Sequence, residues 1–409
     1  MSFTSAGSSW RDVYLAAGAR GVSACGDFLA ATSLALVLQQ AGAGGWAISG
    51  LLLAASVPLA VLAPITGRIA DRADSRTVLI VAGIAQAAVC AALAFASHPL
   101  LIIALVALLA CGLAVTQPTL AALLPAMVRR ADLAKASAIN QTAGMVGMLV
   151  APALAGVLVG QFGARVPLLI DALSYGSLVV AGLLIRTRRS EKAPSGSVRW
   201  RLRTDRLVFV MIAAIAAVVV GVGTINVVEV FFIRETLGAS TTVFGLVAAT
   251  WTLGMLPGAW LFTRFSSRST DPGRLVQASL VFAAVTCAAV LAGAAVGDAW
   301  QLIPLWLLGG AANGAINVVL NVVLAERVPE QARGRAFAAM GSALQGAGMV
   351  GFLLGGPLVD HFAPRPLVAA AGVGGLIAVL LCVPFVRRAR REIAPVSRPL
   401  ELVGDSVNT

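Results

Sequence analysis

Charged side chains are scarce in this sequence: Asp, Glu, Lys and Arg make up only 12% of its 409 residues, while 59% are hydrophobic. The mean hydropathy of the chain is +0.91. A water-soluble globular domain cannot bury apolar surface in that proportion, so the composition excludes that class of protein. It indicates a chain whose solvent is lipid, with roughly 20 apolar residues for each crossing of the bilayer.

The sequence also lacks the motifs that enzymes and nucleotide-driven pumps require. It has only two histidines, His98 and His361, and it contains no Asp-rich metal motif and no GxxxxGK[ST] nucleotide loop. We therefore expect a protein that is not an enzyme and that holds no metal ion and no cofactor. The cysteines fall inside apolar segments, which favours free thiols over disulfides: Cys25, Cys90, Cys111, Cys287 and Cys382.

What the chain does contain is a series of apolar stretches, each long enough for a membrane-spanning helix. They predict about twelve helices, six in each half of the chain. To within several residues, these are expected at 13–38, 46–66, 77–97, 100–124, 136–160, 166–185, 207–233, 242–262, 274–296, 299–324, 335–360 and 364–386.

Basic residues are distributed unevenly between these stretches. Of the 30 Lys and Arg residues, 27 lie at the termini or in connections after even-numbered stretches, and the other connections hold only Arg165, Arg234 and Arg365. Cytoplasmic loops carry the excess of basic residues, so we expect a multi-pass protein of the cell (plasma or inner) membrane with both termini cytoplasmic. The first stretch has no small-residue cleavage site and predicts a span, not a cleavable signal. Because the basic residues are not interleaved with aromatic ones, the net charge of +12 predicts no nucleic acid partner.

The chain contains an internal repeat. Residues 141–147, QTAGMVG, recur as 345–351, QGAGMVG, and the offset of 204 residues is half the chain. A duplication of this kind predicts an N-terminal six-helix bundle over 1–186, a cytoplasmic linker over 187–206, a second bundle over 207–386 and a cytoplasmic tail over 387–409. Parallel repeats of six spans place a substrate site near the bilayer midplane, between the halves.

The segment after the second stretch runs from Gly67 to Arg76 and reads GRIADRADSR. It resembles the signature loop GxxxDRxGRR of the major facilitator superfamily, with Gly67, Asp71, Arg72 and Arg76 in matching positions and Asp74 in place of the usual glycine. The resemblance covers nearly the whole chain and implies an all-α membrane protein of about twelve helices in two six-helix bundles. It also implies that the loop is a cytoplasmic gate, whose Asp71 meets a helix N-terminus or a basic group of the other half in the outward-facing state. The alternative is a charged turn that only sets the topology.

The fifth stretch carries a second family motif. Its residues Gly147, Pro152 and Gly156, within GMLVAPALAG, resemble the exporter-associated motif GxxxGPxxGG with alanine at two glycine positions; the alternative is close packing of helices through small residues. The first stretch and the connection over 124–140 are similar to the drug:proton antiporter branch that includes macrolide and siderophore exporters. The arginine that many drug exporters carry in the fourth helix is absent from 100–128, so that part of their proton relay does not transfer to this chain.

Acidic residues within the apolar stretches are few, and an ionised one costs about 2.5–3.5 kcal/mol at mid-bilayer even on permissive scales. Asp27 lies seven residues beyond Arg20, hence roughly 10 Å deep if Arg20 reaches the interface. We expect Asp27 to be the proton-coupling group, with Glu229 as the second candidate; a structural bond from Asp27 to another helix is the alternative. Three other acids are expected at helix ends or on the outer rim: Asp171, which begins the sixth stretch, Asp298 and Asp360.

Amide side chains are the remaining candidates. Asn313, Asn317 and Asn321 recur at steps of four along one helix face. Such amides could bind a solute, or could bond to neighbouring helices at roughly 0.6 kcal/mol each. The expected substrate cavity contains Asn226, Asn313, Asn317, Gln117, Gln141 and Gln345, between the first, fourth, seventh and tenth helices.

Together these patterns predict a secondary active transporter that exports a small amphipathic solute, such as a drug, antibiotic or siderophore-like compound, by alternating access in antiport with protons. Its partners would be the small-molecule substrate, protons and the lipid bilayer, and we expect a monomer. The alternatives are an uptake symporter or uniporter of a small metabolite and, as a different class, a transporter-like sensor or a membrane enzyme.

Overall fold

The computed structural model describes residues 8–187, 205–266, 272–329 and 332–393. All regular elements in these ranges are helical, and twelve helical segments are long and apolar enough to cross a membrane, which confirms the expected fold class. The elements are α1 (Trp10–Gln40), α2 (Gly44–Arg72), α3 (Ser75–Leu93), α4 (Pro99–Met127), η1 (Arg130–Asp132), α5 (Leu133–Phe162), α6 (Arg165–Ser174), α7 (Gly176–Leu184), α8 (Arg206–Phe231), η3 (Phe232–Thr236), α9 (Thr241–Ser266), α10 (Pro272–Gly293), η4 (Ala299–Gln301), α11 (Leu302–Arg327), α12 (Arg333–His361) and α13 (Pro364–Ile393).

The helices occupy the twelve predicted stretches, with three local differences. Helix α2 continues to Arg72, so most of the expected loop that begins at Gly67 is helical. The sixth span is divided at Tyr175 into α6 and α7. Helix α13 extends beyond the expected end at 386 to Ile393. Most of the expected linker (188–204) and the end of the tail (394–409) lie outside the described residues.

The connections between helices are short and use specific turn residues. Gly42 and Gly238, which follow the first helix of each half, have φ angles of 66° and 62°. This left-handed conformation favours glycine just beyond a helix end. At the start of α8, the Asp205 carboxylate accepts hydrogen bonds from the first backbone N–H groups, and it also forms an ion pair with Arg327 Nε at 2.8 Å.

The sequence repeat reappears in the helix packing. Helix α5 packs along α1 in one half, and α12 packs along α8 in the other. A Cβ atom added to Gly147 would lie 2.4 Å from the Gly21 carbonyl oxygen, and one added to Gly351 would lie 2.3 Å from that of Val220. Equivalent glycines, 204 residues apart, therefore let equivalent helix pairs approach at backbone distance.

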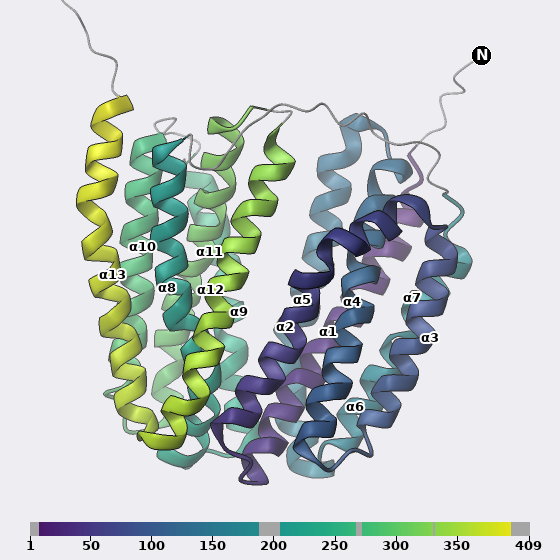
Figure 1. Ribbon diagram of the computed structural model, residues 1–409, viewed down its shortest axis with the longest axis horizontal. Helices are drawn as coiled ribbons and strands as arrows, with labels where there is room; N and C mark the ends of the chain where they lie inside the picture. The colour runs from purple at the N-terminus through teal and green to yellow at the C-terminus, as the bar shows by residue number, and fades with distance from the viewer. Residues whose placement is uncertain (1–7, 188–204, 267–271, 330–331, 394–409) are drawn as a thin grey trace, which may run out of the picture.

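Helices α1–α7 and α8–α13 lie as two groups that converge at one end of the bundle (Figure 1). We call the end at which α1 begins the terminal end, and the opposite end the far end. Two seams, α5 against α9 and α2 against α12, join the groups at the far end. A Cβ atom on Gly156 would lie 2.4 Å from the Thr241 carbonyl oxygen, and one on Gly45 would lie 2.4 Å from that of Gly356. The two groups therefore meet backbone against backbone.

A carboxylate of one half caps a helix of the other half. Helix α2 receives no side-chain hydrogen bond from its own N-cap residue, Ala43. Instead, Asp360 at the end of α12 accepts hydrogen bonds from the backbone N–H groups of Gly45 at 2.6 Å and Trp46 at 3.3 Å. Two further hydrogen bonds cross between the halves near this end: Ser49 Oγ to the Phe352 carbonyl at 2.6 Å and Gln39 Nε2 to Glu235 Oε1 at 2.9 Å.

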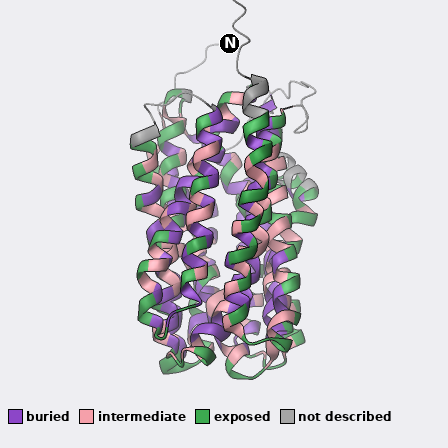
Figure 2. Ribbon diagram, turned by 90° about the vertical axis from the view of Figure 1, so that its left-hand side faces the viewer, coloured by how far each residue is buried: buried purple, intermediate pink, exposed green. Residues whose placement is uncertain are grey.

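The outside of the bundle is apolar. Figure 2 shows exposed residues along the full length of the helices, and large apolar side chains are among them, including Val61, Leu173 and Leu380. Soluble proteins rarely expose contiguous apolar surface of this extent. The outer surface is therefore suited to lipid.

Candidate functional site

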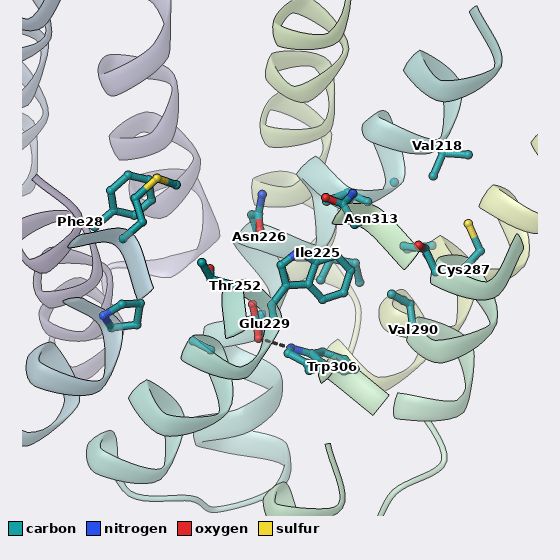
Figure 3. A pocket seen from close by; sticks show the side chains of 18 residues that line it. Phe28, Val218, Ile225, Asn226, Glu229, Thr252, Cys287, Val290, Trp306 and Asn313 are labelled. Atoms are coloured by element: carbon teal, nitrogen blue, oxygen red, sulfur yellow. Dashed lines mark hydrogen bonds between the residues drawn. The ribbon is translucent and has the colours of Figure 1, made fainter. Parts of the chain in front are cut away.

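Two adjoining cavities lie inside the bundle. The C-half cavity has a volume of about 290 Å³, and most of its lining comes from α8 to α11. The N-half cavity has a volume of about 330 Å³ and is lined by α1, α4, α5 and α7. Phe28 and Met148 line both, so the two cavities adjoin at these side chains. Figure 3 shows the C-half cavity with Phe28 reaching in from the opposite half.

Glu229 stands at the far-end side of the C-half cavity, because it lies in the last turn of α8. Its Oε1 accepts a hydrogen bond of 2.7 Å from Trp306 Nε1 (Figure 3). The Trp306 ring in turn meets Trp251 edge to face, with centroids 6.3 Å apart. The carboxylate is thus held by one indole ring, which itself packs against a second.

Asp27 lies on the wall of the N-half cavity, where its Oδ1 accepts a hydrogen bond of 2.6 Å from the Tyr175 hydroxyl. Asp27 and Tyr175 also border a small, mostly apolar cavity of about 70 Å³ on the far-end side, together with Asp171. Arg20 lines the N-half cavity too, but no ion pair joins it to Asp27 in the described part of the chain. Asp27 therefore separates a polar space from an apolar one.

Asp171 does not lie at a helix N-terminus, and that prediction was wrong. It lies six residues after the start of α6, is fully buried, and accepts hydrogen bonds from Cys90 Sγ at 3.2 Å and Ser174 Oγ at 3.0 Å. At 1.5 Å per residue that position is about 9 Å beyond the helix start, the same depth argument that identified Asp27. Tyr175, Trp251 and Trp306 were also missed, since nothing in their spacing distinguishes them from other aromatic residues of a membrane helix.

The candidate amides are divided between the cavities. Asn226 and Asn313 line the C-half cavity with Glu229, and Gln117 and Gln141 line the N-half cavity with Asp27. Two others line neither: Asn317, whose side chain bonds to Asn313 on its own helix at 3.0 Å, and Gln345, which is exposed on α12.

The first, fourth, seventh and tenth spans correspond to α1, α4, α8 and α11, and all four contribute to the cavities, but so do α5, α9 and α10. The seam explains part of this. Met148 and Pro152 precede the seam residue Gly156 on α5, and Trp251 follows the seam on α9. Because α5 and α9 pack against each other at the far-end seam, their residues next to the seam face the space between the halves.

The gate residues lie at the terminal end, whereas the exporter-type motif runs from the middle of α5 to the far-end seam. Of the expected gate residues, Gly67, Asp71 and Arg72 are in the last turns of α2, where their side chains lie outside the described part of the structure, and Arg76 is exposed at the start of α3. The exporter-type motif runs along α5: Gly147 contacts α1 within its own half, whereas Gly156 contacts α9 across the far-end seam.

Comparison with known proteins gives relatives over most of the chain. The Major Facilitator Superfamily family model matches residues 16–229 and 210–404. The uncharacterized MFS-type transporter YfiS of Bacillus subtilis (strain 168) is 24% identical over 365 residues, which cover 83% of this chain and 84% of the relative. The multidrug resistance protein MdtG of Dickeya zeae (strain Ech586) is 25% identical over 344 residues, covering 82% and 83%.

Among solved structures, a bacterial homolog to the human lysosomal transporter Spinster, in an inward-facing and unoccupied conformation, superposes with a TM-score of 0.69. The sequence identity is 14%, and the match covers 93% of this chain and 97% of that one, so the likeness concerns the fold. The family match spans both repeats, and the fold, the repeat and the signature residues agree with it. The chain belongs to the major facilitator superfamily, whose members are membrane transporters and not enzymes.

Proposed function

We propose that this transporter exports a small amphipathic solute in exchange for protons, by alternating access between its two halves. The observation that carries the proposal is the placement of one acid in each cavity, Asp27 and Glu229, with no ion pair to either in the described part of the chain. A carboxylate at this depth needs a proton or a cationic partner when water leaves the cavity. Each acid can therefore link occupancy of the cavity to uptake or release of a positive charge.

The distribution of basic residues supports a cytoplasmic terminal end, and with it both termini in the cytoplasm of the cell membrane. In that orientation the far-end seams close the outer side, and solute enters from the cytoplasm. Rocking of the halves 1–186 and 207–386 about the cavity would then open the far end and close the terminal end, where Asp71, Arg72 and Arg76 form the gate with Gly67.

The proton step is assigned to Asp27. Opening of the far end to the acidic outer side would let Asp27 take a proton, and opening of the terminal end would let it release that proton to the cytoplasm. Its hydrogen bond from Tyr175 holds the carboxyl at the boundary between the polar and apolar cavities. Glu229, in the other half, is the second candidate for this role.

The solute class rests on the cavity walls and on the relatives. The C-half cavity is lined mainly by apolar and aromatic side chains, with Asn226 and Asn313 among its few polar groups, as expected for a ligand with an apolar body and few polar groups. Relatives named multidrug resistance proteins support membership of the drug:proton antiporter branch. Both cavities and both halves come from one chain, which supports a monomeric transporter.

The test uses purified protein in liposomes with labelled chloramphenicol and erythromycin as probes. The wild type should accumulate at least one probe in vesicles with an acidic lumen, and no probe without the pH difference. Asp27→Asn should abolish this accumulation and retain exchange of probe across the membrane without a gradient. Asp298→Asn removes a charge from an exposed helix cap outside both cavities and should behave as the wild type. Accumulation by Asp27→Asn at the wild-type rate would refute the role of Asp27, and probe movement that ignores the pH difference would refute antiport.

A further inference from the structure

The Glu229 carboxylate offers one oxygen to the C-half cavity. Oε1 is taken by Trp306 Nε1, and no described residue donates a hydrogen bond to Oε2. Glu229 is also the one residue of the cavity lining with a formally charged side chain. A molecule in this cavity therefore meets a single, oriented carboxyl oxygen, which carries negative charge when Glu229 is ionised.

Two arginines at the far end of this half hydrogen-bond to backbone carbonyls, although the buried Nε of Arg234 has no partner. Arg234, just beyond α8, donates to the backbone carbonyl of Ala239. Arg365 donates to the carbonyls of Ala294 and Val296, and its guanidinium lies over the Phe232 ring. Within the described residues no cation of the protein pairs with Glu229, so the ionised form of this carboxylate needs a cation from the cavity's occupant.

The surroundings of Glu229 suit an organic cation better than a metal ion. Trp306 contacts the carboxylate, and Trp251, which packs against Trp306, lines the same cavity; indole faces attract cations more strongly than other aromatic rings do. Among the described residues no group of three or more His, Cys, Asp or Glu side chains could ligate a metal. The remaining wall is largely apolar, with Val218, Ile225 and Val290 (Figure 3).

The indole of Trp251 is held in place by glycines of α11. A Cβ atom added to Gly309 would lie 2.9 Å from Trp251 Cζ3, and one added to Gly310 would lie 2.1 Å from the Trp251 carbonyl oxygen. Only a helix without side chains at these two positions leaves room for the ring and the backbone of α9 together. The aromatic wall beside Glu229 is thus a built feature of the α9–α11 contact.

We propose that the space between Glu229, Trp251 and Trp306 binds the cationic group of a monovalent organic cation with an apolar body, such as a quaternary ammonium or phosphonium compound. This assignment rests on the proposed export function and names its substrate class. Glu229 holds the charge of the cargo, and Asp27, in the other half, holds the proton. The two positive charges therefore bind at separate acids.

The test compares two ions of nearly the same shape and opposite charge, tetraphenylphosphonium and tetraphenylborate, binding to the full-length protein in detergent by isothermal titration calorimetry. The wild type should bind the phosphonium more tightly than the borate. Glu229→Gln should weaken phosphonium binding by about tenfold or more, the size expected for a lost charged contact beside aromatic rings, without weakening borate binding. The control variant Asp298→Asn should leave both affinities unchanged.

Two outcomes would overturn the assignment: wild-type protein that does not prefer the phosphonium, or Glu229→Gln that binds it with wild-type affinity. If Glu229→Gln does not elute as a monodisperse peak, Glu229→Asp and Trp251→Leu take its place, and each should weaken the phosphonium selectively. The measurement needs no gradient, so its failure leaves proton-driven accumulation of chloramphenicol untouched. Conversely, Glu229-dependent phosphonium binding by a protein that transports no probe would overturn the proposed function alone.

Discussion

Asp360 caps α2 from the opposite half, so its removal should weaken closure of the far end. In the closed arrangement its carboxylate accepts two backbone hydrogen bonds, from Gly45 at 2.6 Å and Trp46 at 3.3 Å. Loss of a side-chain cap costs about 0.5–2 kcal/mol, and a negative charge near a helix N-terminus contributes about 0.3–1 kcal/mol. Asp360→Ala should therefore shift the balance between the closed and open far end by about 1–2 kcal/mol, a five- to thirtyfold change in the population ratio.

Asp360→Asn provides a graded comparison. Asparagine keeps an acceptor oxygen and loses only the charge, so the shift should be about two- to fivefold. His361→Gln alters the neighbouring residue, whose ring nitrogen contacts the Pro357 carbonyl of its own helix, and should leave the balance unchanged.

The measurement is double electron–electron resonance between spin labels at Ser97 and Ala295, exposed positions in far-end connections of the two halves, with the native cysteines replaced. The fraction of long distances should rise in the order wild type, Asp360→Asn, Asp360→Ala. Identical distance distributions for the wild type and Asp360→Ala would refute the capping argument. An equal effect of His361→Gln would show that the helix end as a whole is sensitive, and not the carboxylate.

Other substitutions separate contacts within a half from contacts between halves. Gly147→Ala places a Cβ atom 2.4 Å from the Gly21 carbonyl oxygen inside one half and should lower the yield of folded protein. Gly156→Ala places a Cβ atom 2.4 Å from the Thr241 carbonyl oxygen across the seam, and should leave a folded protein with more long distances between the same spin labels. Equal yields and equal distances for the two variants would contradict this. Tyr175→Phe removes the hydroxyl that donates a hydrogen bond of 2.6 Å to Asp27, and should destabilise the protein by about 1–3 kcal/mol. The loss should appear as a lower midpoint of thermal unfolding. An unchanged midpoint would show that Asp27 finds another donor. Asp71→Asn should leave the protein folded but weaken the gate that holds the terminal end closed in the outward-facing state. The far end should then be open less often, which lowers the accessibility of an engineered far-end cysteine. Unchanged accessibility with normal transport would show that this segment only sets the topology.

The fold could be predicted from the sequence because the bilayer dictates the length of each apolar stretch, and the repeat that includes Gln141 and Gln345 relates the halves. The sequence predicted the place of Asp27 from its depth, and four of the six candidate amides also line the cavities: Asn226, Asn313, Gln117 and Gln141. Asp171 was misplaced because it was assigned to the helix N-terminus, although the sixth stretch was expected from residue 166 and α6 begins at Arg165. The hydrogen bond between Trp306 and Glu229 joins residues 77 positions apart in the sequence, and no sequence spacing predicts such a contact. The capping of α2 by Asp360 could not be predicted either, because the lack of a capping side chain at Ala43 does not identify the distant carboxylate that replaces it.

The glycine seams have a consequence for the speed of the transport cycle. Ordinary helix packing inserts side-chain ridges into grooves, so two such helices rotate against each other only as their side chains leave those grooves. At Gly156 and Thr241 backbone meets backbone, whereas at the seam between Gly45 and Gly356 the side chains of Val359 and Ser49 also pack against the glycines. Rigid-body rotation of the halves then requires little rearrangement of the α5–α9 seam, and the activation barrier for opening depends mainly on the α2–α12 seam, with Val359 and Ser49 packed against its glycines, and on the polar bonds of Asp360, Ser49 and Gln39.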